Sequence, residues 1–377
     1  MFGLLREANF DPQVVFEPET GSEMPDVTGL APRVIAEGFS LIVFQKVHGA
    51  SVERMVRELS AAGVKTAYLV CDLINLEMAK ATEVTIVVTD YLKTLYPEAL
   101  QSKIYVVHDG IEAPAAYKTS WSMHRGSRKC PLEAVLVTSV DLDQLPVLET
   151  PPDWLRVTIV GRYAPADRPL QRLRNIGWKL RARHSMRERL PYLRFLADSR
   201  IRCMAWDATG VYAAMQQADI GIIPIDAGVG LEQQAGTPLL SWKVKSENRL
   251  TMKMSIGLPV IATPIPAYEP LIKAGQNGFL ARTKQEWEKC LEALRDPIFR
   301  RAIGEHARAS VTERYSMRAQ AECLVVALRA AIDPPAGTAF PPALSAECGT
   351  SPVLHVDHGV DCCSPSPRNE TAGSPRP

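Results

Sequence analysis

The feature that most constrains this chain is the alternation of short apolar runs with amphipathic helical patterns. In the first part of the chain the runs fall at 41–44, 66–70, 84–88 and 104–107, and 14–16 is a further candidate. Strands that recur every ~20–25 residues, with helices between them, are typical of βαβ units and a parallel sheet. The first part of the chain is therefore expected to form a parallel sheet.

One helix of this first part can be read in detail. Val52, Met55, Val56 and Leu59 follow the i, i+3, i+4, i+7 spacing of one helical face. Ser51 is the expected N-cap and Gly63 the expected stop of this helix.

The alternation breaks over the polar stretch 114–129 and then restarts. The later runs fall at 134–138, 157–160, 201–205, 220–225, 260–263 and 279–281. The α/β chain is thus expected to form two Rossmann-like, doubly wound parallel-sheet domains, 1–115 and 134–315, joined by a linker at 116–133. Ligands of such folds bind beyond the carboxyl ends of the strands, here in the cleft between the domains.

The C-terminal part of the chain contains a long helical pattern and then a tail. The helical stretch 298–332 either covers the second domain or, over 316–333, crosses back to the first. From 334 to 377 proline and small polar residues dominate, which predicts disorder because such a segment buries too little apolar surface.

Composition excludes several classes of protein. The 377 residues include 43 Lys and Arg against 42 Asp and Glu, and this balance argues against a dedicated nucleic-acid binder. The N-terminal residues lack the order of a secretory signal, and no uncharged apolar run approaches ~18 residues. The 8 cysteines form no CxxC, and Cys362 and Cys363 beside His355 and His358 make only a weak metal candidate. We expect a cytoplasmic chain with no metal and no nucleic-acid partner.

The segment 156–202 is strongly basic, with 12 Arg and 1 Lys against 3 carboxylates. Leucines and aromatic residues are interleaved with these charges. The sequence favours an arginine-rich insertion, over 162–200, that packs its apolar side on the second domain. The alternative is a peripheral contact with an anionic membrane at its inner, cytoplasmic face.

The segment 245–269 contains the clearest candidate site. Its pattern predicts a loop, a helix, a glycine turn, a strand and a second loop, with Ser246 as the N-cap of the helix. Lys245, Asn248 and Arg249 surround that helix start, whose free backbone N–H groups and dipole favour a phosphate or diphosphate. An ordinary capped surface helix with basic neighbours is the alternative.

Motifs in this part of the chain resemble the donor-site region of group 1, family-4-like glycosyltransferases with the GT-B fold. The matching segments are ADIGIIPI at 218–225, GLPVIAT at 257–263, Glu269, GQNGFL at 275–280 and RYS at 314–316. VVHDGI at 106–111 resembles the end of the family's first domain. The resemblance is strong over 205–332 and weaker over 41–114. The first domain is short for this family, as a truncated domain would be.

The resemblance implies a function. A nucleotide-sugar donor would bind the second domain, and a saccharide or lipid-linked acceptor would lie against the first. The reaction would transfer a hexosyl group in carbohydrate or polysaccharide biosynthesis, with retained configuration and without an essential metal or other cofactor. Lys245 and Arg249 would stabilise the departing diphosphate, with Ser246, Asn248, Glu269 and Arg162 as further donor-binding residues.

The candidates for catalysis follow strands of the first domain. His48 would lie near the reacting sugar, and Asp72 would accept a proton from the acceptor hydroxyl. His108 is a similar strand-end histidine. Each of these residues also has an ordinary structural interpretation, as an exposed loop residue or a helix cap.

Departures from the family pattern keep other hypotheses open. The family carries two glutamates eight residues apart, the second binding the ribose; here these positions hold Val244 and Met252. The usual Arg and Lys after the domain's first strand are replaced by Ser139-Val140-Asp141, and Arg162 is the substitute cation unless it serves only solubility. A catalytically inactive GT-B-like binding or scaffold protein is the alternative function. A nucleotide-sugar epimerase of the same fold is a further alternative function. A Rossmann dehydrogenase is disfavoured, because no G-x-G-x-x-G motif follows a predicted strand in this sequence. Donor specificity is expected to depend on the loop 226–242.

Overall fold

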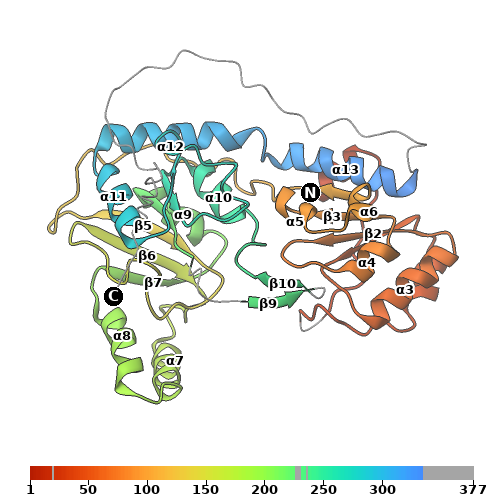
Figure 1. Ribbon diagram of the computed structural model, residues 1–377, viewed down its shortest axis with the longest axis horizontal. Coiled ribbons are helices and arrows are strands. Elements are labelled where there is room, and N and C mark those ends of the chain that lie inside the picture. Colours follow the sequence, from red (N-terminus) through yellow and green to blue (C-terminus); the bar gives the residue numbers. More distant parts are fainter. Residues whose placement is uncertain (19–20, 226–230, 235–236, 334–377) are drawn as a thin grey trace, which may run out of the picture. The chain divides into compact units, whose positions relative to one another are not determined.

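The computed structural model describes residues 1–18, 21–225, 231–234 and 237–333, and residues Met1–Pro335 belong to one compact unit. Two parallel sheets and their helices make up this unit (Figure 1). The predicted disorder of 334–377, the cysteines from Cys348 onward and much of the specificity loop 226–242 lie outside the described residues.

The first sheet has four parallel strands that follow one another in chain order. They are β1 Leu41–Gln45, β2 Lys65–Val70, β3 Val84–Val87 and β4 Ile104–Val106. The four predicted runs are confirmed as strands. The fifth, 14–16, is wrong: Val14 and Phe16 are 68% and 42% exposed and pair with no strand among the described residues.

The helices of this half are short except for α3. They are α1 Phe2–Glu7, α2 Leu30–Ala36, α3 Ala50–Ala61, α4 Leu76–Ala81, α5 Asp90–Thr94 and α6 Glu98–Gln101. The predicted apolar face of α3 is buried, and Gly63, at φ +83°, follows the end of the helix as expected. Ser51 is not its N-cap, because α3 begins one residue earlier, after Gly49. The Ser51 hydroxyl instead donates to the Pro25 carbonyl and accepts from the Val27 N–H.

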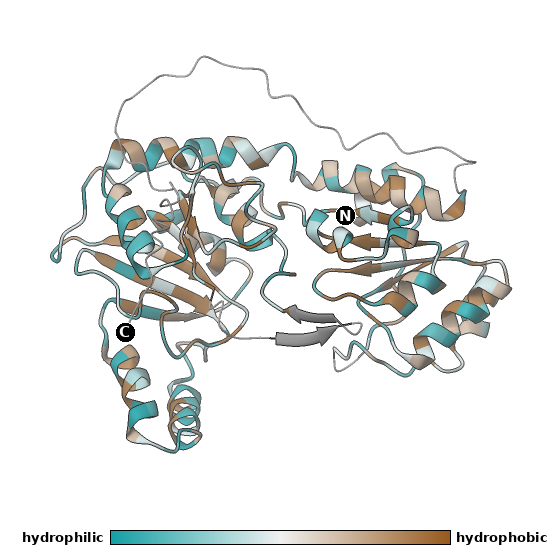
Figure 2. Cartoon of the chain, in the orientation of Figure 1, coloured by the Kyte–Doolittle hydropathy of each residue, from teal (hydrophilic) through white to brown (hydrophobic). Residues whose placement is uncertain are grey.

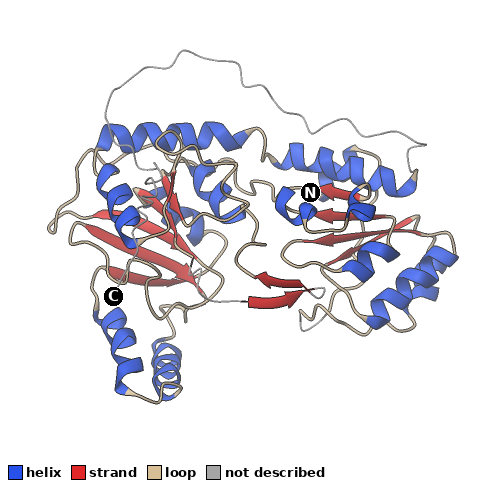
Figure 3. Cartoon of the chain, viewed as in Figure 1, coloured by secondary structure: helices blue, strands red, loops and turns tan. Residues whose placement is uncertain are grey.

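The second sheet has six parallel strands in the order β12-β11-β8-β5-β6-β7. They are β5 Leu132–Val137, β6 Leu155–Gly161, β7 Ile201–Ala205, β8 Ile220–Ile223, β11 Val260–Ala262 and β12 Phe279–Leu280. All six predicted runs are confirmed (Figure 3). The order reverses between β5 and β8, so this sheet is doubly wound. In the first sheet the described strands show no such reversal.

The helices of the second half surround this sheet. They are α7 Pro169–Arg181, α8 Met186–Ala197, α9 Gly210–Gln217, α10 Asn248–Ile256, α11 Lys284–Ala293 and α12 Pro297–Thr312. A hairpin of β9 Leu231–Gln234 and β10 Thr237–Leu240 falls within the expected loop 226–242. The sequence analysis did not anticipate this hairpin.

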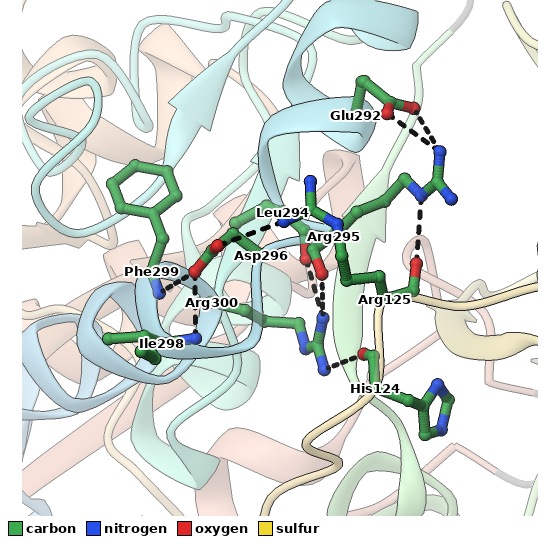
Figure 4. Close-up of polar contacts among 9 residues, drawn as sticks. All are labelled: His124, Arg125, Glu292, Leu294, Arg295, Asp296, Ile298, Phe299 and Arg300. Atoms are coloured by element: carbon green, nitrogen blue, oxygen red, sulfur yellow. Dashed lines mark hydrogen bonds and ion pairs between the residues drawn. The ribbon is translucent and has the colours of Figure 1, made fainter. Parts of the chain in front are cut away.

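The linker predicted at 116–133 is fixed by a buried arginine of α12. The Arg300 guanidinium, fully buried, donates to the carbonyls of His124, Leu294 and Arg295 (Figure 4). It also donates to the Ser122 carbonyl. These carbonyls satisfy a charge that would otherwise be costly to bury. The linker is therefore part of the packed structure.

The final helix returns to the first sheet. The predicted stretch 298–332 is two helices, α12 and α13 Met317–Ile332, and Ser316 caps the second by accepting from the Ala319 N–H. Leu324, Ala327, Leu328 and Ala331 pack with Ala67 and Ile86 of β2 and β3. Helix α13 thus contacts β2 and β3 of the first sheet, and Figure 2 shows the alternating hydropathy of α13.

We expect Leu328→Ala to remove stability from the first sheet. Leu328 is 4% exposed, and truncating a buried leucine costs about 2–4 kcal/mol. Hydrogen exchange should therefore accelerate at the amides of β2 and β3. Val326→Ala is the matched control, because Val326 lies on the same helix and is 57% exposed. Equal exchange in the two variants would contradict the packing role of α13.

Candidate functional site

A cavity of about 480 Å³ lies at the carboxyl edge of the second sheet, where the strand order reverses. Its lining comes from the loop after β5, from Ile225 after β8, from Thr263 and Pro264 after β11, and from Trp242 and Arg282. Cavities of this size hold small-molecule ligands, and strand-order reversals are their usual place in open α/β sheets. This cavity is the candidate ligand site.

The segment 244–249, directly before and into α10, contacts both sheets. Val244 is fully buried in the apolar core of the first sheet. The Lys245 Nζ atom lies 3.1 Å from Oδ2 of Asp72, which follows β2. The Arg249 Nη2 group donates to the Ser139 hydroxyl, which follows β5, at 3.0 Å. The segment thereby joins the carboxyl edges of the two sheets.

The start of α10 has no side-chain cap. The helix begins at Asn248 and its N-cap is Glu247, whose side chain makes no capping hydrogen bond. Ser246, the predicted N-cap, lies one residue too early, so that prediction is wrong. The Leu250 N–H donates to the Glu247 carbonyl, and no described side chain accepts from the N–H groups of Asn248 and Arg249, which lie beside the Lys245 and Arg249 side chains. This is the arrangement that binds phosphates at helix N-termini.

Close packing fixes the position of α10. The helix ends at Ile256 with Gly257, at φ +93°, as its C-cap, and a Cβ at Gly304 of α12 would collide with the Gly257 carbonyl oxygen and the Trp121 ring. Lys253, fully buried in α10, has its pKa lowered to about 7 by burial and by Arg249. Its Nζ atom donates to the Arg249 carbonyl at 3.3 Å.

A buried pair joins the end of β4 to the start of α10. The Glu247 side chain is 2% exposed, and its Oε1 atom lies 2.5 Å from Nδ1 of His108. Burial acts to lower the pKa of His108, but Glu247 outweighs it and the net pKa is raised. The His108 Nδ1 atom also lies 3.1 Å from the Val88 carbonyl, and no described residue gives Glu247 a well-oriented hydrogen bond. The pair therefore depends on the charge of His108.

Asp72 lies between two lysines. Lys46 Nζ is 3.0 Å from one of its oxygens and Lys245 Nζ is 3.1 Å from the other. Burial acts to raise the pKa of Asp72, but the hydrogen bonds from both lysines lower it on balance. A carboxylate with a lowered pKa stays ionised and is a weak base. The contacts of Asp72 therefore suit a role in positioning Lys245.

The remaining candidates lie apart from these contacts. His48 follows β1, half-buried, and its backbone N–H donates to the Glu23 carbonyl. Arg282, which lines the cavity, donates to the exposed Glu269 at 3.3 Å. Arg162 follows β6 and is exposed; within the described part of the chain its side chain contacts none of these groups. The structure thus gathers Lys245, Ser246, Asn248 and Arg249 at α10 and links Glu269 to the cavity through Arg282.

Sequence reasoning did not assign Glu247, Lys46, Ser139 and Arg282 to the site. Lys46 and Ser139 follow predicted strands, and this strand-end position was the available signal. Glu247 lies within the candidate segment but off the family's glutamate positions. Nothing local in the sequence singles out Arg282.

The structure gives a physical reason for the departure at position 244. Val244 lies in the core of the first sheet, where a carboxylate would be costly without a partner. Met252 lies on α10 and packs, half-buried, against the apolar cluster around Val137 and Ile256. Both positions serve packing in this chain.

Comparisons with known proteins establish the fold. No protein-family model matches the sequence, and no curated protein matches it. A glycosyltransferase structure from Rickettsia africae is similar at 12% identity, with 88% of each chain covered and a TM-score of 0.56. Anabaena Alr3699/HepE in complex with UDP is similar at 15% identity, with 83% of this chain and 84% of that chain covered and a TM-score of 0.54. The chain therefore has the fold of GT-B glycosyltransferases.

We expect the contribution of His108 to stability to depend on pH. Because the pKa of His108 is raised in the folded protein, its stabilisation is complete below the unfolded value of about 6.5. It is lost as the pH rises through the folded pKa. The difference in melting temperature between the wild type and His108→Gln should therefore be largest near pH 6 and narrow toward pH 9.

His184→Gln is the control for this experiment, because His184 is exposed. Its melting temperature should follow the wild type throughout. A difference in melting temperature between the wild type and His108→Gln that widens as the pH rises would contradict stabilisation by the pair of His108 and Glu247.

Proposed function

We propose that this chain is a glycosyltransferase that moves a sugar from a nucleotide-sugar donor to a saccharide or lipid-linked acceptor. The observation that carries this proposal is the uncapped start of α10, flanked by Lys245 and Arg249, at the same carboxyl edge of the second sheet as the cavity. Lys245 is placed by Asp72 and Arg249 by Ser139. The site therefore offers fixed positive charge where a diphosphate would leave.

The chemistry follows from this placement. When the bond between the sugar and the diphosphate breaks, negative charge develops on the leaving oxygen. Preorganised N–H groups and cations stabilise such charge most where water is excluded. Two cations and a helix N-terminus can supply this stabilisation in place of a metal ion, so we infer metal-independent transfer. Retention of configuration is part of the same proposal.

The nucleoside would occupy the cavity at the strand-order reversal. Trp242 and Arg282 offer an aromatic face and a charged donor there, and Glu269 is paired with Arg282. Structures of the Anabaena protein contain UDP or UDP-glucose, so we propose a uridine nucleotide as the first donor to test. Because Met252 cannot accept a hydrogen bond from the ribose as a carboxylate does, ribose contacts must come from other groups.

The acceptor would approach the carboxyl edge of the first sheet. His48 follows β1 there, and we propose that it contacts the acceptor or the reacting sugar. Asp72 follows β2, and two roles are proposed for it. It either accepts a proton from the acceptor hydroxyl or holds Lys245 in position. A peripheral place at the cytoplasmic face of a membrane belongs to the same proposal, since a lipid-linked acceptor would be met there.

A catalytically inactive binding protein is the second candidate. The absence of both family glutamates, at Val244 and Met252, favours it. Such a protein would bind the nucleotide but release no sugar. An epimerase would instead convert the donor without any acceptor, so product analysis with and without acceptors separates the three.

We expect Lys245→Ala and Arg249→Ala each to weaken UDP binding. Hydrogen bonds to charged groups contribute about 1.5–3 kcal/mol, or roughly 10- to 100-fold in Kd. Isothermal titration with UDP, GDP, ADP, CMP and dTDP measures this and identifies the base. Lys273→Ala, an exposed lysine of the same half of the chain, should bind as the wild type does. Unchanged affinity for UDP in both site variants would show that the diphosphate does not bind at the start of α10.

We expect His48→Ala to slow the release of UDP from a UDP-sugar by at least about 10-fold, as for the loss of a group acting in the transition state. The Kd for UDP itself should stay unchanged, because His48 lies at the edge of the first sheet. If the rate is unaffected while the wild type is active, His48 has no part in the reaction.

A further inference from the structure

Helices α7 and α8 form a hairpin between β6 and β7. Its inner side is anchored: Tyr192 and Phe195 are buried in the core of the second sheet, and Ile176 and Leu180 pack against that core. Lys179 lies 2.9 Å from Asp141, and Arg183 pairs with Asp143. The hairpin is thus a fixed part of the domain.

The outer side of the hairpin is apolar. Leu170, Leu173 and Trp178 on α7 are 76%, 64% and 69% exposed. On α8, Met186, Leu190 and Leu193 follow one helical face at i, i+4 and i+7 and are 66%, 43% and 39% exposed. The sequence-based expectation that this insertion packs its apolar side on the domain is therefore correct only for its inner face.

Positive charge accompanies these apolar stripes. From Arg168 to Ala197 the hairpin has 9 Lys and Arg residues and 1 carboxylate, Glu188. Positions 170, 174, 178 and 181 are related by i, i+4, i+8 and i+11, so Arg174 and Arg181 share the face of Leu170 and Trp178. Apart from Lys179 and Arg183, the seven other basic residues of the hairpin form no ion pair with any described residue: Arg168, Arg172, Arg174, Arg181, Arg187, Arg189 and Arg194.

We propose that the α7–α8 hairpin docks on an anionic membrane surface. Its leucines, Met186 and Trp178 would enter the headgroup region while the arginines meet lipid phosphates, as in interfacial amphipathic helices. Charge complementarity favours this occupant over a second copy of the chain, because a two-fold interface would oppose arginine with arginine. Among the described residues, no helix is long and apolar enough to cross a bilayer.

Vesicle flotation of the full chain tests the proposal. Vesicles of phosphatidylcholine alone are compared with vesicles that also contain about 30% phosphatidylglycerol, since the attraction needs anionic lipid. We expect at least about 10-fold more bound protein with the anionic lipid, and a loss of binding as salt is raised from about 0.1 M to about 0.5 M.

Two variants separate the apolar and charged contributions. Leu173→Ser/Trp178→Ser and Arg174→Gln/Arg181→Gln should each reduce binding about 10-fold, with unchanged melting temperatures because all four side chains are exposed. Arg33→Gln/Arg301→Gln removes the same charge from other exposed helices and should bind as the wild type does. Trp178 fluorescence should shift to the blue on binding.

Equal flotation with both vesicle types, or none, would overturn the proposal. Light scattering that shows a dimer, dissociated by Leu173→Ser/Trp178→Ser, would assign the surface to a second copy. The assay contains no donor, so its failure would leave UDP binding at α10 untouched.

Discussion

The architecture depends on how the first sheet is covered. A parallel sheet with strands in simple chain order receives its connecting helices on one face, because the crossovers share one hand. Yet β2 is buried on both faces, with Tyr68 toward α3 and Ala67 toward α13. Helix α13, from the end of the described chain, covers the second face together with α1. This packing fixes the first half of the chain against the last helix.

The candidate site is built where a second segment contacts both sheets. The segment 244–249 has Val244 in the first core and Arg249 at the second sheet's edge. His108 and Glu247 add a charged contact at the start of α10. The cations proposed to meet a diphosphate are thus positioned by packing and by Asp72 and Ser139. Packing also accounts for valine where the family carries a glutamate.

The periodicity of the sequence predicts all ten strands of the two parallel sheets, because apolar runs and βαβ spacing are local signals. Helix caps were less predictable. Ser51 and Ser246 are good capping residues and lie within one or two residues of the actual helix starts, but neither is the N-cap of its helix. The contacts of Glu247, Lys46 and Ser139 join residues far apart in the chain, which no local pattern encodes. The exposure of Leu170 and Trp178 likewise became visible only when the hairpin's inner face was known.

The central claim is that a nucleotide diphosphate binds at the start of α10. Hydrogen exchange of the full chain with and without UDP tests it most directly, because a ligand slows exchange where it covers or orders the backbone. The account predicts slower exchange over 245–252 and in the loop 139–149, with no change in the hairpin 169–197. Protection confined to other segments, or none at saturating UDP, would contradict it.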